Sequence, residues 1–128
     1  MKSRDSLIRL KRFHVEEKQR QLAQIESMIA EFERMAKELN DQILAEQERS
    51  GIHDAGHFAY PTFAKAAMQR RDNLTASASE LKEQLAAAKD DRDEAIEDLQ
   101  KHEAIAERDH ASEKQVAHKT AEASAAAR

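Results

Sequence analysis

The side chains best suited to chemistry in this sequence are its six histidines. His53 and His57 are four residues apart, a spacing at which two imidazoles on one helix can bind zinc. Gly51 and Gly56 predict a turn here instead of a helix, and Asp54 alone does not complete a set of four ligands. We therefore expect ordinary loop polarity at this pair and no metal site.

Three further histidines recur every eight residues, at His102, His110 and His118. Eight helical residues rise about 12 Å, which is too far for these side chains to share one metal ion. The carboxylates are spread along polar helical faces, whereas acid–base catalysis needs a pocket that perturbs a pKa. The sequence has no cysteine and no glycine-rich phosphate loop. It therefore predicts no enzymatic activity, no catalytic residue, no cofactor and no metal.

The first twenty residues are basic, with seven basic and three acidic side chains, a net charge of +4. A stripe of this kind can bind nucleic-acid phosphates, but Asp5 interrupts it and the whole chain carries −4, so we expect no nucleic-acid partner. Binding to a membrane surface needs a broad apolar face, whereas Leu7, Leu10 and Phe13 supply a narrow one. A plain solvated helix and a docking end for a protein partner both remain open.

A second unusual stretch concentrates large apolar side chains within twelve residues: Ile52, Phe58, Tyr60 and Phe63. One interpretation is an apolar plug that closes a turn. The other is an aromatic anchor for a partner, because interface hot spots favour such side chains. Both can hold together, with Arg70 and Arg71 on the adjacent turns as a charged rim.

The composition limits which elements can position these residues. The 128 residues are 36% charged and 4% aromatic, with two glycines and one proline. So few turn residues exclude collagen-like and most all-β folds. No apolar run approaches the roughly 20 residues that span a bilayer, and the start lacks the apolar region of a secretory signal. We expect long helices with a thin apolar stripe and no stable membrane insertion.

Apolar residues in the first half repeat at alternating spacings of three and four, the heptad pattern of packed helices. This seam comprises Leu22, Ile25, Ile29, Phe32, Ala36, Leu39 and Ile43, and it continues backwards through Lys18, Val15, Lys11 and Ile8. The pattern predicts a helix over about residues 4–50. Residues 51–61 hold both glycines and the proline, and they predict a turn.

The second half has its own seam, formed by Ala67, Leu74, Ala78, Leu81, Leu85, Ala88, Ala95 and Leu99. Arg71 and Arg92 are exceptions to it, and Ile96 and Ile105 fit better after a register slip. The pattern predicts a helix over about residues 62–113. Residues 114–128 are rich in alanine and polar side chains, and we expect a frayed or disordered tail there.

A connection of about ten residues between two long helices folds them back on each other. We therefore predict an all-α fold, a long two-helix antiparallel coiled-coil hairpin over residues 1–113. Residues 80–113 hold five basic and twelve acidic side chains, net −7, and would face the basic residues 1–20 in this arrangement. The alternative is one continuous coil in a parallel homodimer, with a kink at the glycine and proline residues.

Three segments resemble a known family: the opening Met1–Phe13, the connection Arg49–Ile52 leading to His57–Thr62, and Arg70–Leu74. Together they resemble the FliJ family of flagellar export proteins, in its alphaproteobacterial form, over roughly residues 1–110. The resemblance implies an antiparallel coiled coil similar to the central stalk of rotary ATPases. It also implies a component of flagellar type III export that is cytoplasmic or peripheral at the cytoplasmic face of the basal body.

The same resemblance implies three classes of partner: the hexameric export ATPase, the cytoplasmic domain of the export gate, and export chaperones or substrates. The implied ATPase-docking residues are Leu7, Leu10, Lys11, Arg12 and Phe13. The implied gate contacts are Leu39, Ile43, Gln47, Phe58, Tyr60, Phe63 and Arg70, in which Tyr60 and Phe63 match the family's Tyr-x-x-Phe pattern. From the residues alone, a structural homo-oligomeric spacer and a general holdase chaperone using Met28 and Met35 stay open.

Overall fold

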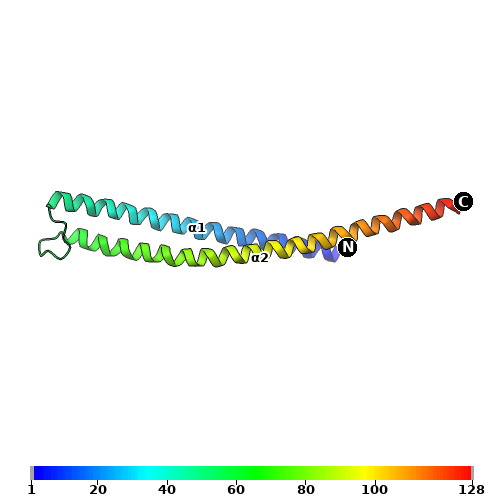
Figure 1. Cartoon of the computed structure of the whole chain (residues 1–128), viewed down its shortest axis with the longest axis horizontal. Coiled ribbons are helices and arrows are strands. Elements are labelled where there is room, and N and C mark those ends of the chain that lie inside the picture. The colour runs from blue at the N-terminus through cyan, green and yellow to red at the C-terminus, as the bar shows by residue number, and fades with distance from the viewer. Residues whose placement is uncertain (1, 128) are drawn as a thin grey trace. The chain divides into compact units, whose positions relative to one another are not determined.

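The computed structural model describes residues 2–127 and contains two α-helices, α1 (Lys2–Ser50) and α2 (Thr62–Ala126). A loop over residues 51–61 joins them (Figure 1). The helices pack against each other in opposite directions, and no strand occurs within residues 2–127. The predicted all-α, two-helix antiparallel hairpin is therefore confirmed. Met1 and Arg128, which begin and end the predicted segments, lie outside the described residues.

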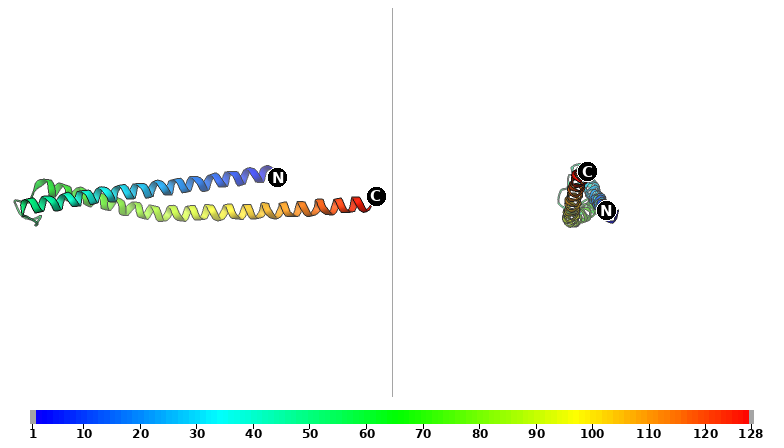
Figure 2. Two further views of the ribbon diagram at one scale, coloured as in Figure 1. Left: turned by 90° about the horizontal axis from the view of Figure 1, so that it is seen from above. Right: turned by 90° about the vertical axis from the view of Figure 1, so that its right-hand side faces the viewer.

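The chain divides into two compact units. The loop unit comprises Arg20–Lys89, and the terminal unit comprises Met1–Gln19 together with Asp90–Arg128. Within the loop unit, the second part of α1 and the first part of α2 lie side by side, and the terminal unit pairs the remaining parts of the same helices (Figures 1 and 2).

The loop unit has a core of large side chains on α1 and small ones on α2. Leu22, Ile29 and Ile43 are buried on α1, while Ala64, Ala67, Ala78 and Leu81 are buried on α2. Alanines on one helix allow the large side chains of the other to fill the space between the two axes. The heptad pattern thus identified the buried face of both helices in this unit.

The buried face of α2 keeps its three-four rhythm through both arginines. Arg71 and Arg92 are half-buried at seam positions, and the rhythm continues through Ala95, Leu99, His102 and Ala106. Arginine is tolerated there because its stem covers apolar surface while the guanidinium reaches the edge. The expected register slip is absent from the described residues, since Ile105 lies on the exposed flank of an unbroken seam.

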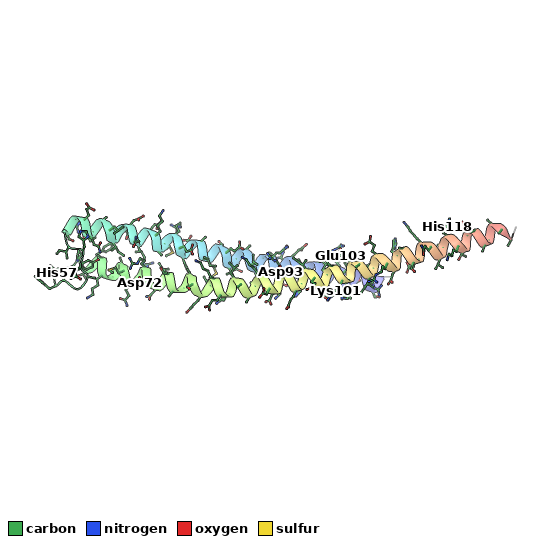
Figure 3. All side chains as sticks on the ribbon, in the orientation of Figure 1. His57, Asp72, Asp93, Lys101, Glu103 and His118 are labelled. Atoms are coloured by element: carbon green, nitrogen blue, oxygen red, sulfur yellow. The ribbon has the colours of Figure 1, made fainter. Side chains whose placement is uncertain are left out.

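Helix α2 extends past residue 113, where the sequence led us to expect a frayed or disordered tail. It runs to Ala126, and its residues from 107 onwards are exposed. Within the terminal unit it continues beyond the start of α1, as the part carrying His118 shows (Figures 2 and 3). Alanine has the highest intrinsic helix propensity, which favours helix there without packing from α1.

The loop is held by local hydrogen bonds at both helix ends. Gly51 has a φ of 75°, and its N–H donates to the Gln47 carbonyl at 2.9 Å, the bond of a left-handed helix cap. The Pro61 carbonyl accepts the Lys65 N–H at 3.1 Å, which starts α2 at Thr62. The predicted helix ends near Ser50 and Thr62 are confirmed.

Candidate docking surfaces

Among the described residues of the terminal unit, three ion pairs join α1 to α2. Arg4 pairs with Asp109 and Lys11 with Asp98, while Arg12 Nη2 lies 3.2 Å from Glu103 Oε2. The basic start of the chain therefore faces the acidic part of α2, as the charge distribution predicted; Glu103 is labelled in Figure 3. Each exposed ion pair of this kind contributes little to stability. We therefore assign these pairs mainly to setting the antiparallel direction and the register in which α1 packs on α2.

The Asp98 carboxylate lies close to basic side chains of both helices in the terminal unit. The ammonium of Lys11 donates a hydrogen bond to Asp98 Oδ2, and this bond lowers the pKa of the Asp98 carboxyl. His102 Nε2 lies 3.6 Å from Asp98 Oδ1 and adds a weaker attraction when it is protonated. The seam position of Lys11 is thus occupied by a paired charge, which explains how lysine is accommodated in an apolar stripe.

The five expected ATPase-docking residues fall into two groups. Leu7, Leu10 and Phe13 are exposed, at 38%, 63% and 54% of their surface. Lys11 and Arg12 are engaged with Asp98 and Glu103 on α2. The structure therefore places the apolar members of the set on the surface, whereas the two basic members form ion pairs with α2 of the same chain.

A groove lies beside these apolar residues. Its α1 wall contains the apolar residues Leu7, Leu10 and Phe13 together with Lys11, His14 and Glu17, and its α2 wall is formed by Ala95 and Asp98. We call it the side groove. The buried seam residues Ile8 and Val15 hold this stretch of α1 against α2, so the side groove rests on a packed support.

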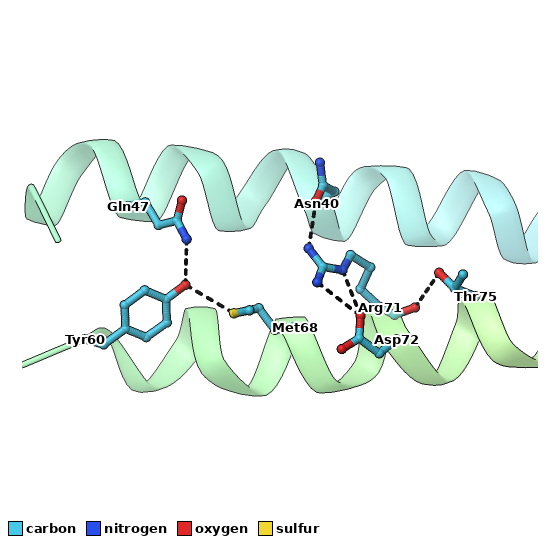
Figure 4. A network of polar contacts seen from close by, with 7 residues as sticks. All are labelled: Asn40, Gln47, Tyr60, Met68, Arg71, Asp72 and Thr75. Carbon is cyan, nitrogen blue, oxygen red and sulfur yellow. Dashed lines mark hydrogen bonds and ion pairs between the residues drawn. The ribbon is translucent and has the colours of Figure 1, made fainter. Parts of the chain in front are cut away.

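The expected gate-contact residues also divide, and most of them are interior. Ile43 and Tyr60 are 2% and 7% exposed, and Leu39 and Gln47 are half-buried. Gln47 Nε2 donates to the Tyr60 hydroxyl at 2.9 Å, and that hydroxyl lies 3.3 Å from Met68 Sδ (Figure 4). These side chains build the interior beside the loop.

The other three residues of that set lie on the surface: Phe58, Phe63 and Arg70. Phe58 is 96% exposed, and its ring stacks on His57 with centroids 4.7 Å apart. Local hydrogen bonds fix this part of the loop, since Ala59 N–H donates to His57 Nδ1 at 3.0 Å and Gly56 N–H to Asp54 Oδ1 at 2.9 Å. The loop thus combines a buried aromatic, Tyr60, with a presented one, Phe58.

The sequence interpretation missed two polar links of the loop unit. Arg71 Nη1 donates to Asn40 Oδ1 at 2.8 Å, and Met68 completes the surroundings of the Tyr60 hydroxyl (Figure 4). An arginine at a seam position is a signal for a polar side chain on the facing helix, and Asn40 directly follows the seam residue Leu39. Met68 lies on α2, eight residues after Tyr60 of the loop, and no heptad position links the two residues.

Among residues 2–127, no group of three or more histidine, aspartate or glutamate side chains is placed to hold a metal ion. Over the same residues, neither helix has an apolar stretch long enough to cross a bilayer. Comparison of the chain with family models, with curated proteins and with solved structures finds no match.

Proposed function

We propose that this chain is a non-enzymatic component of the bacterial flagellar type III export apparatus. In this proposal it binds the export ATPase ring and the export gate, assists chaperone and substrate handling, and hydrolyses nothing itself. Support comes from the resemblance of its opening, its loop and the Arg70–Leu74 segment to the FliJ family. The fold is the hairpin that this resemblance implies.

The observation that carries the proposal is the exposed apolar trio of the terminal unit, Leu7, Leu10 and Phe13. Exposing three large apolar side chains to water on one short stretch of a charged helix is unfavourable, and a partner that covers them would recover this free energy. Ile8 and Val15 are the buried seam residues of this stretch, whereas the trio keeps 38%, 63% and 54% of its surface exposed. We assign it to contact with the ATPase.

For the export gate, the proposal assigns direct contact to the exposed residues Phe58, Phe63 and Arg70. The interior residues Ile43, Gln47 and Tyr60 then act by supporting the loop that carries Phe58. An aromatic side chain held by a preformed loop loses little conformational entropy on binding. A partner pocket for Phe58 would therefore recover most of the free energy of burying its ring.

A pull-down with the export ATPase tests the proposal. Full-length chain is compared with a truncation lacking residues 1–13 and with Leu10→Ser, which leaves the buried seam intact. Leu44→Ser is the matched control, because Leu44 is similarly exposed in the loop unit. We expect the truncation and L10S to lose ATPase binding and L44S to retain it. Undiminished binding by both L10S and the truncation would remove the docking role of this end.

A further inference from the structure

We propose that the side groove binds a partner helix whose apolar face covers Leu7, Leu10 and Phe13 and whose flank toward α2 is basic. This inference deepens the proposed docking role of the terminal unit, on which it rests for the partner's identity. It specifies the chemistry of the element that binds: an amphipathic α-helix with lysines or arginines along one edge.

The shape of the side groove favours a helix. Leu7, Leu10 and Phe13 follow one another at intervals of three, so they form a stripe that runs along α1 and wraps outward from the groove. Ala95 and Asp98 on α2 form the opposite wall. A third helix lying along such a stripe inserts its own apolar residues at helical spacing, the helix-in-groove mode of recognition.

The acidic residues on the α2 wall favour a partner helix whose flank is basic. Asp91, Glu94 and Asp98 line one side of an adjoining groove, together with His14 and Lys18 of α1. Asp98 is paired with Lys11, whereas Asp91 and Glu94 have no ion pair with another described residue. Asp91 and Glu94 thus lie in the groove that adjoins the side groove, where the carboxylates outnumber the ammonium of Lys18, and basic side chains on the incoming helix would pair with them.

The same carboxylates disfavour two other occupants. An anionic membrane surface would take up the apolar stripe but would be repelled by Asp91 and Glu94. A second copy of this chain meeting through the same surface would bring a second set of these carboxylates to the contact. A basic amphipathic helix is the occupant that both the apolar stripe and its acidic border fit.

The test measures binding of two synthetic amphipathic helical peptides to the full-length chain by fluorescence anisotropy. Both peptides carry the same leucine face; one has lysines along its flank and the other has glutamates. We expect the lysine peptide to bind at least about tenfold more tightly. Leu10→Ser should weaken its binding about tenfold, Glu94→Lys should remove most of the preference between peptides, and Leu44→Ser should change neither. Circular dichroism confirms equal helix content among the variants.

The inference is overturned if the wild-type chain binds neither peptide, binds both equally, or binds the lysine peptide as tightly in L10S. It is also overturned if L10S abolishes binding to phosphatidylserine vesicles or abolishes self-association, since the surface would then serve a membrane or a second copy. Loss of peptide binding with an intact ATPase pull-down contradicts this inference alone. Peptide binding as expected without ATPase capture contradicts the proposed function alone.

Discussion

Gln47 on α1 donates a 2.9 Å hydrogen bond to the hydroxyl of Tyr60, the buried aromatic next to the start of α2. The same hydroxyl donates to Met68 Sδ at 3.3 Å. Tyr60 is therefore fixed from both helices, while Phe58, two residues earlier, is exposed. This division within three residues separates the part of the loop that holds the fold from the part that a partner can reach.

Tyr60→Phe should lower the free energy of unfolding by about 1 kcal/mol. The ring stays packed, but Gln47 loses its acceptor in a half-buried place. Urea unfolding followed by circular dichroism measures the change. Phe58→Ala is the matched control and should stay within about 0.5 kcal/mol of wild type, because its ring is exposed. Equal losses in both variants would contradict the assignment of Tyr60 to the interior.

Gly51→Ala should destabilise the hairpin by about 1 kcal/mol, the cost of placing a Cβ in the left-handed conformation. No atom lies within 4 Å of the position that a Cβ would occupy, so the cost comes from the backbone alone. The thermal midpoint of unfolding reports it. An unchanged midpoint would show that α1 does not end in this cap.

Ile43→Ala should cost about 2 to 5 kcal/mol, since it removes a buried seam side chain and leaves a cavity. Its neighbour Leu44 is exposed, and Leu44→Ala should cost less than about 0.5 kcal/mol. The pair differs by one position on the helix and tests which face is packed. Similar losses in the two variants, measured by urea unfolding, would refute the seam.

Acid should weaken the terminal unit partly through Asp98. The Lys11 hydrogen bond lowers the pKa of the folded carboxyl, so its stabilising effect is complete above the pKa of an unfolded aspartate, about 3.9. It is lost as the pH falls through the lower, folded value. Asp98→Asn should therefore show a smaller drop in melting temperature than wild type on acidification from neutral pH. An identical drop in both proteins would exclude a contribution from this pair.

The fold could be predicted from the sequence because the heptad pattern of apolar residues repeats along both helices. The heptad positions from Ile8 to Ile43 are buried or half-buried as expected, and the glycines and the proline marked the loop. The predicted register slip was wrong, because it assumed that Ile96 and Ile105 lie on the seam, whereas the seam continues unbroken through Ala95 and Leu99 and leaves Ile105 exposed. Arg71 also occupies a seam position, and its guanidinium donates to Asn40, a partner that only the facing helix reveals.

Less of the candidate site was predictable. Exposure of Leu7, Leu10 and Phe13 followed from their place off the seam. Tyr60 and Phe58 lie in one aromatic-rich loop, and spacing alone does not tell a buried ring from a presented one. That distinction depends on loop hydrogen bonds and on contacts with Gln47 and Met68 from two helices.

The motility of a strain that lacks this chain tests the central claim most directly. We expect the deletion strain to lose swimming in soft agar, and the wild-type chain and Leu44→Ser to restore it. Leu10→Ser, expressed at the same level, should restore it poorly. A deletion strain that assembles flagella and swims normally would contradict the proposed role in export.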